Sequence, residues 1–237
     1  KLLNRPKKIF LGLGDFLEIG DYSKLMDSLF YDMGGTLFEN TLDNINRIIS
    51  DVGDVPASFL KLAVYYPDFL LKDVPTFCVS VIGRKSRLFP GAKIFIQFIK
   101  EYDPLILTAM PYEISIEFAR RMGLEENNLV STKYKITQNK KNKNIYAGDI
   151  KRFISGNRKI IEIEKSMIKN DLKEKDIIYI GRGEAGAKTF SRVSSIAMNP
   201  SKQILSESKI NIYGSSLESL LVLFNYNNEI ESFLMSK

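Results

Sequence analysis

Residues 87–124 have the sequence RLFPGAKIFIQFIKEYDPLILTAMPYEISIEFARRMGL, and this stretch decides the fold. Apolar residues recur at helical spacing over 92–99, which predicts an amphipathic helix. The apolar run Leu105–Leu107 is typical of a short buried strand. A second helix is predicted over 114–122, ended by Gly123. The order is therefore helix, strand, helix, as in an α/β protein.

Thr108 stands at the carboxyl end of the strand in this stretch, just before the second helix. A hydroxyl at that place, together with nearby backbone N–H groups, faces the region where α/β sheets bind anions. A simpler interpretation is that Thr108 caps the following helix. The stretch alone leaves both interpretations open.

The rest of the chain alternates strands and helices, which predicts a doubly wound, mainly parallel sheet. The long helical pattern after the first strand predicts a cap inserted over the strand ends. We expect an α/β core from residues 1–15 and 87–237, and a helical cap from 16–86. The predicted core strands cover 7–13, 105–107, 128–132, 175–181, 195–198 and 210–213, and the further helices cover 157–169, 185–191 and 217–234.

Composition limits the classes of function. The chain has no histidine, which excludes Ser-His-Asp hydrolysis and His-ligated zinc. It has one cysteine, Cys78, and no apolar run near the length of a membrane span, so we expect a cytoplasmic protein without a membrane span.

The formal net charge is +6, and much of the excess lies in KYKITQNKKNK, residues 133–143. This run belongs to a basic excursion over 133–149 that we expect to be a solvated loop. Only Tyr134 supplies an aromatic ring within the run, and no nucleic-acid motif accompanies it. We therefore expect no nucleic-acid partner.

The order of motifs resembles the haloacid dehalogenase superfamily. Its phosphatases carry DxDGT after the first strand, a Ser or Thr after the second, a Lys, and then GDGxxD after a later strand. Here the corresponding segments are KKIFLGLGD, LTAMPY, Lys159 and IIYIGRGEAGAKTF. The sequence looks most similar to the archaeal group of energy-converting hydrogenase A subunit R proteins, through LFPGAKIFIQFI, LTAMPY and SSIAMNP. That likeness also implies a long helical cap.

The resemblance implies a site with most of its acids missing. In the family, one Asp attacks phosphorus, a second protonates the leaving group, and carboxylates hold Mg²⁺, while the Thr and the Lys bind phosphate oxygens. Thr108 and Lys159 match. The four positions that the family fills with acids hold Gly12, Gly14, Arg182 and Gly186.

We therefore expect a degenerate phosphohydrolase site that binds a small phosphorylated or other anionic ligand without catalysis. The binding residues would be Thr108, Lys159 and Arg182, because a guanidinium in place of a metal-binding acid repels Mg²⁺ and attracts anions. No cofactor is expected, and a protein partner would suit an accessory role.

A second alignment remains open. Residues 30–37, FYDMGGTL, resemble DxDGT more closely than LGLGD does, and they offer Asp32 as a nucleophile. The protein would then be a Mg²⁺-dependent phosphatase, with Asp32 and Glu184 as metal ligands. Against this alignment, Gly34 would replace the acid/base Asp, and the strand over 7–13 would precede the first motif.

Overall fold

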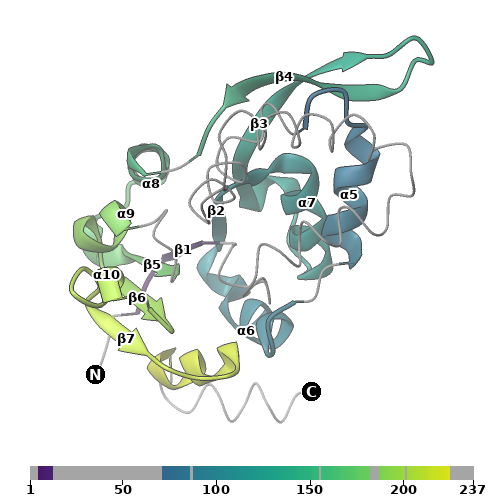
Figure 1. Cartoon of the computed structure of the whole chain (residues 1–237). Helices are drawn as coiled ribbons and strands as arrows, with labels where there is room; N and C mark the ends of the chain where they lie inside the picture. The colour runs from purple at the N-terminus through teal and green to yellow at the C-terminus, as the bar shows by residue number, and fades with distance from the viewer. Residues whose placement is uncertain are drawn as a thin grey trace.

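The computed structural model describes residues 5–12, 71–85, 88–154, 156–181, 187–200 and 202–224. They build a seven-stranded sheet with the order β4-β3-β2-β1-β5-β6-β7 (Figure 1). All neighbouring strands are parallel except β3 and β4, which are antiparallel. The strands are β1 (Lys8–Leu11), β2 (Leu105–Pro111), β3 (Leu129–Gln138), β4 (Asn144–Arg152), β5 (Ile177–Gly181), β6 (Ser195–Met198) and β7 (Ile210–Ile212).

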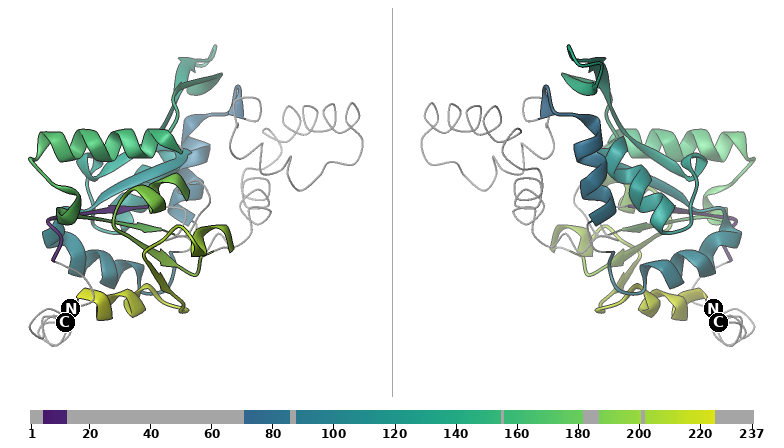
Figure 2. Two further views of the ribbon diagram at one scale, coloured as in Figure 1. Left: turned by 90° about the vertical axis from the view of Figure 1, so that its left-hand side faces the viewer. Right: turned by 90° about the vertical axis from the view of Figure 1, so that its right-hand side faces the viewer.

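Helices cover both faces of this sheet. In the described part of the chain, the α-helices are α5 (Thr76–Lys85), α6 (Ala92–Ile99), α7 (Tyr112–Arg121), α8 (Asn157–Lys169), α9 (Ala187–Arg192) and α10 (Lys202–Leu205). The 3-10 helices are η2 (Lys100–Tyr102), η3 (Glu126–Asn128), η4 (Glu174–Asp176) and η6 (Leu217–Phe224). Figure 2 shows α8 on one side of the sheet and α6 with η6 on the other. The fold is the predicted doubly wound, mainly parallel α/β sheet.

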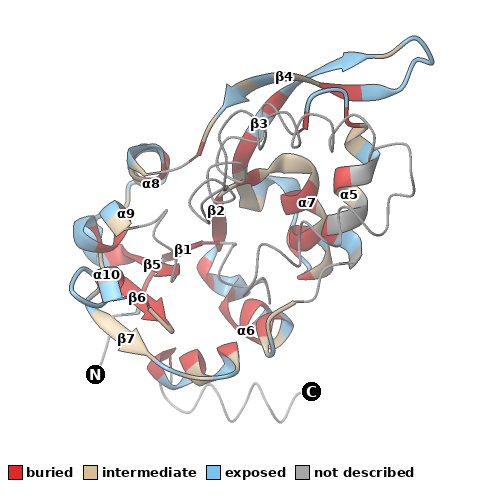
Figure 3. Cartoon of the chain, viewed as in Figure 1, coloured by how far each residue is buried: buried red, intermediate tan, exposed pale blue. Residues whose placement is uncertain are grey.

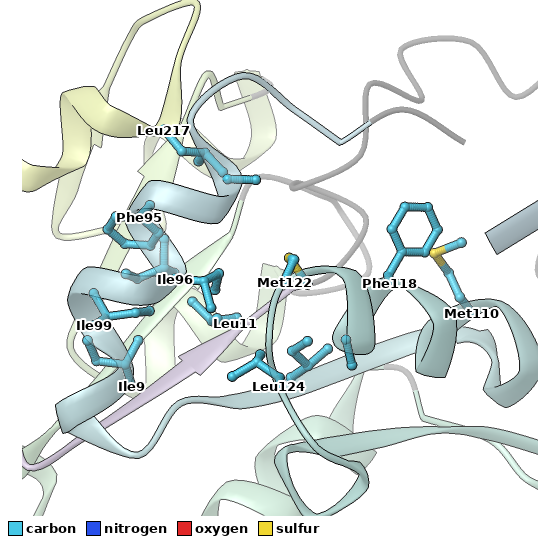
Figure 4. Close-up of a cluster of buried hydrophobic side chains, with 14 of the residues drawn as sticks. Ile9, Leu11, Phe95, Ile96, Ile99, Met110, Phe118, Met122, Leu124 and Leu217 are labelled. Carbon is cyan, nitrogen blue, oxygen red and sulfur yellow. The ribbon is translucent and has the colours of Figure 1, made fainter. Parts of the chain in front are cut away.

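Strand β1 shows why helices must cover both faces of the sheet. Its residues Ile9, Phe10 and Leu11 are all fully buried. Side chains alternate between the faces of a strand, so Ile9 and Leu11 pack with α6 and α7 (Figure 4). Phe10, on the other face, packs with α8 and α9. A strand that is apolar at every position is typical of a parallel sheet covered on both sides. The buried residues accordingly follow the strands and the inner sides of the helices (Figure 3).

The prediction of a solvated basic loop over 133–149 is wrong, because most of these residues form a β-hairpin. Strand β3 continues to Gln138, and β4 returns from Asn144. Tyr134 and Tyr146 are buried, and their rings meet edge to face with centroids 5.5 Å apart. The side-chain oxygen of Asn139 accepts hydrogen bonds from two backbone N–H groups of the turn. The frequent lysines interrupt the apolar residues of β3 and β4, which made the two strands hard to recognise in the sequence.

The predicted closing helix over 217–234 also differs where it is described. Residues 217–224 form the 3-10 helix η6, and residues 225–237 lie outside the described part. The buried residues of η6 are Leu217, Leu220, Leu221, Leu223 and Phe224.

Of the predicted cap, only residues 71–85 fall within the described part. The helix α5 at its end packs on α7, where the Arg121 guanidinium donates a hydrogen bond of 2.8 Å to the Gly83 carbonyl. The domain boundaries at 15 and 87 remain a prediction. Among the described helices, none combines the length and apolar character needed to cross a membrane.

Glu162, on α8, forms an ion pair with Arg152 at the end of the β3–β4 hairpin. Its side chain is 10% exposed, and its oxygens contact Arg152 at 2.7 Å and Lys165 at 3.0 Å. Burial alone would raise the pKa of Glu162, but the hydrogen bonds from Lys165 and Arg152 outweigh burial and lower the pKa below its ordinary value. The carboxylate is therefore ionised in the folded protein at neutral pH.

We predict that Glu162→Gln lowers the free energy of unfolding at pH 7 by on the order of 1 kcal/mol. The folded-state pKa is depressed, so the stabilisation by Glu162 is complete above its unfolded value of 4.5 and is lost as the pH falls through the folded value. Urea unfolding across this range should therefore show the variant and the wild type converging in acid. Glu164→Gln, at an exposed position of the same helix, is the control. A pH-independent difference would contradict the prediction.

Gly91 and Gly123 both have backbone angles that strain other residues, but only Gly91 is also closely surrounded by other atoms. Their φ angles are 74° and 77°, in the left-handed region that favours glycine. A Cβ at Gly91 would collide with Ser216 Oγ and lie 2.9 Å from the Glu218 nitrogen, whereas a Cβ at Gly123 would meet nothing within 4 Å. Gly91 therefore allows η6 to approach the turn before α6, where the Leu217 N–H bonds the Pro90 carbonyl.

We predict that Gly123→Ala costs about 1 kcal/mol of stability, from strain alone. Gly91→Ala should cost a further 1–3 kcal/mol, on the order of other overpacking substitutions. Urea denaturation of both variants measures the difference, and equal losses would show that η6 does not dock closely against Gly91.

Candidate functional site

The carboxyl ends of β1, β2 and β5 lie at one edge of the sheet, because these neighbouring strands are parallel. Gly12 directly follows β1, the middle strand of the three. It is buried, and its N–H donates a hydrogen bond of 2.9 Å to the Ile180 carbonyl. Gly12 therefore extends the pairing of β1 with β5 and presents no side chain to this edge.

Thr108 lies close to the same edge on β2. Leu11 is in register with Ile106, so Thr108 is two residues further along. The residue is 3% exposed, and its hydroxyl oxygen accepts a hydrogen bond of 3.1 Å from the Met110 N–H. Helix α7 begins after Pro111 without a side-chain cap, so Thr108 does not cap it. Among the described residues, no acceptor takes the hydroxyl hydrogen of Thr108.

Ser131 brings a second hydroxyl beside Thr108. The two residues are in register on the neighbouring strands β3 and β2. Ser131 is 2% exposed, and its hydroxyl oxygen has no hydrogen-bond partner in the part of the chain that the structure describes. Buried hydroxyls usually have partners, so this one is exceptional. Sequence reasoning missed Ser131, because only the register of β2 and β3 reveals that it stands next to Thr108.

Lys159 is in the first turn of α8, which runs from the edge region back towards the start of β5. The residue is 5% exposed, and its ammonium donates a hydrogen bond of 3.4 Å to the Tyr179 hydroxyl. Tyr179 is buried beside Phe190, with ring centroids 5.1 Å apart. Sequence reasoning missed Tyr179 as a partner of Lys159, since it lies in an otherwise apolar run.

A buried ammonium is costly unless other groups stabilise its charge. Thr108 and Lys159 belong to opposite sides of the sheet, since Ile106 packs with α6 and α7 while Tyr179 packs with α8 and α9. The structure thus places the Thr108 hydroxyl and the Lys159 ammonium on opposite faces of the sheet.

The other predicted site residues lie outside the described residues. They are Gly14, Asp32, Arg182, Glu184 and Gly186. Within the described ranges, no group of three or more Asp, Glu, His or Cys side chains is arranged to hold a metal ion. Mg²⁺ prefers carboxylates and other oxygen ligands. The described groups near this edge are Gly12 and the hydroxyls of Thr108 and Ser131.

Comparisons with known proteins address the fold. No protein-family model matches the chain, and no curated protein sequence matches it. Solved structures do. A phosphoserine phosphatase in apo form is 14% identical, with a TM-score of 0.63 over 92% of this chain and 98% of that one.

The structures of two bacterial proteins are also similar to this chain, again at low sequence identity. A HAD family hydrolase from Salmonella enterica serovar Typhi is 15% identical, with a TM-score of 0.68 over 94% of this chain and 72% of that one. A probable phosphoserine phosphatase from Vibrio cholerae is 13% identical, with a TM-score of 0.64 over 95% and 67%. The chain therefore has the α/β fold of the haloacid dehalogenase superfamily.

Proposed function

We propose that this protein is a haloacid dehalogenase-like binding protein that has lost phosphohydrolase catalysis. Its ligand is a phosphate group or another small anion, held at the carboxyl edge of the sheet. The observation that carries the proposal is Gly12, which directly follows the central strand β1.

The position of β1 makes Gly12 decisive. β1 pairs with β2 on one side and with β5 on the other, so residues 8–11 hold the place between the strands that end near Thr108 and Gly181. In the superfamily that this chain resembles, the nucleophilic Asp follows the strand in this place. Glycine has no side chain that could attack phosphorus, so phosphoryl transfer through this position is lost.

The remaining groups favour binding. The Thr108 hydroxyl is a hydrogen-bond donor with no acceptor among the described residues, and Lys159 supplies a positive charge. Charged donors make the stronger hydrogen bonds to phosphate oxygens. By resemblance, Arg182 would add a guanidinium where the family has a metal-binding acid. Such a set holds an anion without Mg²⁺, which suits an accessory role within a protein complex.

A second candidate function is a Mg²⁺-dependent phosphatase that uses Asp32, with Glu184 as a further metal ligand. The motif FYDMGGTL favours it, because it resembles DxDGT. This candidate requires Asp32 to reach the edge where Thr108 lies, although the central strand of the described sheet is Lys8–Leu11. We therefore prefer the binding protein.

We predict that the protein binds inorganic phosphate and that Lys159→Met and Thr108→Val each weaken the binding about 10- to 100-fold. A hydrogen bond to a charged group contributes about 1.5–3 kcal/mol, which corresponds to that range of affinity. Isothermal titration calorimetry measures the dissociation constants.

Lys169→Met is the matched control for Lys159→Met, because Lys169 is exposed at the far end of the same helix. Thermal melting without phosphate shows whether each variant remains folded. If folded Lys159→Met and Thr108→Val bind phosphate as the wild type does, the edge is not the anion site.

We also predict no Mg²⁺-dependent hydrolysis of phosphoserine or p-nitrophenyl phosphate above the chemical background. Millimolar Mg²⁺ should leave the melting temperature unchanged, whereas a metal at one hundred times its dissociation constant would add about 2.7 kcal/mol of stability. A phosphate-release assay and thermal melting provide the two measurements. Turnover that is abolished by chelator and by Asp32→Asn, but persists in Gly12→Ala, would select the phosphatase instead.

A further inference from the structure

The β3–β4 hairpin, residues 129–152, contains the whole formal net charge of the protein. Seven of the 34 Lys and Arg residues lie in it, against one of the 28 Asp and Glu residues. The rest of the chain therefore has 27 of each sign and is formally neutral, while the hairpin accounts for the entire +6. A charge this concentrated creates a strong local potential.

The cations of the hairpin are exposed to solvent. Lys135 pairs with Asp149 at 3.1 Å, and Arg152 pairs with Glu162 at 2.7 Å. Lys140, Lys141 and Lys151 have no ion-pair partner among the described residues. The seven exposed cations are Lys133, Lys135, Lys140, Lys141, Lys143, Lys151 and Arg152.

The outer part of the hairpin projects from the body of the protein. The pairing of β3 with β2 ends at Thr132, which is opposite Pro111, and beyond it β3 pairs only with β4. The hairpin is the extension at the top of Figure 1, and both views of Figure 2 show its tip extending beyond the ends of the helices. Its tip is therefore accessible to a large partner.

Two exposed apolar side chains accompany these cations. Ile136 on β3 is 48% exposed. Phe77 on α5 is 55% exposed, and the Lys143 ammonium lies 6.0 Å from the centroid of its ring. Segment 72–75 borders β4 through bridges to Tyr146 and Ile145, which brings α5 beside the hairpin. Lys143 and Phe77 thus place a positive charge beside an exposed apolar ring.

We propose that the hairpin and Phe77 form a docking surface for an acidic segment of a partner protein. Carboxylates of the segment would face the lysines, and apolar residues among them would contact Ile136 and Phe77. Charge complementarity of this kind speeds and orients association. The proposal does not depend on anion binding at the sheet edge.

The chemistry of the hairpin favours a protein over a nucleic acid. Six of its seven cations are lysines, and its one arginine, Arg152, already binds Glu162. Arginine is the residue suited to bidentate recognition of phosphate and of bases. The hairpin tyrosines, Tyr134 and Tyr146, are buried, so Phe77 is the exposed ring of this surface, whereas single strands usually stack successive bases on several rings.

The test measures fluorescence anisotropy of a labelled acidic peptide, rich in Glu with interspersed Leu, titrated with the full chain. We expect binding at about 50 mM salt that weakens several-fold at about 300 mM, since salt screens exposed charges. Replacing Lys140, Lys141 and Lys143 together by Glu should weaken binding at least about tenfold. The turn should survive, because Asn139 bonds backbone N–H groups and not these side chains. Circular dichroism checks the fold.

The matched control replaces Lys93, Lys100 and Lys169 by Glu, which changes the net charge equally at exposed positions outside the hairpin. It should retain the affinity within about twofold. Equal losses in the two triple variants would overturn the proposal, because the binding would then follow total charge.

A further variant tests the apolar contacts. The pair Ile136→Ser and Phe77→Ser should lower peptide affinity about fivefold, as expected when modest apolar contacts are lost. Unchanged affinity would overturn the assigned apolar contacts. A single-stranded oligonucleotide or anionic lipid vesicles that bind more tightly than the peptide at matched charge and salt would overturn the choice of a protein partner.

Discussion

The two-sided pairing of β1 is the constraint on which the rest of the structure depends. Its backbone is paired with β2 and with β5, and its side chains are buried on both faces. A strand in this position needs helices above and below, which α6, α7, α8 and α9 supply. It also places the residue that follows β1 at the centre of the carboxyl edge. Gly12 is the residue in that place.

The core elements could be predicted from the sequence where the apolar pattern is local and dense. Helix α8 and strand β6 have the predicted bounds, and β1 lies within its predicted range. The hairpin could not be recognised, because Tyr134 and Tyr146 stabilise it only when they meet across the strands. The apolar residues of 217–224 indicated a helix, but Leu217, Leu220, Leu221 and Phe224 also fit α-helical spacing, so the sequence did not predict the 3-10 form.

The residues of the candidate site likewise divide into those that the sequence could predict and those that it could not. Thr108 and Lys159 could be singled out from their places relative to a strand and a helix. Ser131 and Tyr179 could not, because their importance comes from register and from a contact across the fold. Lys159 is itself unusual among lysines, since it is nearly fully buried. Retaining a cation in such a place is costly unless it has a function or a close partner.

The confinement of the net charge to one hairpin has a consequence for colloidal behaviour. Proteins near zero net charge tend to associate and precipitate, while a net charge keeps molecules apart. Outside the hairpin, the acidic and basic residues of this chain are equal in number. The mutual repulsion of protein molecules in solution therefore arises almost entirely from the hairpin. Neutralising it by a bound acidic segment would remove that repulsion, so a complex would be closer to its solubility limit than the free protein.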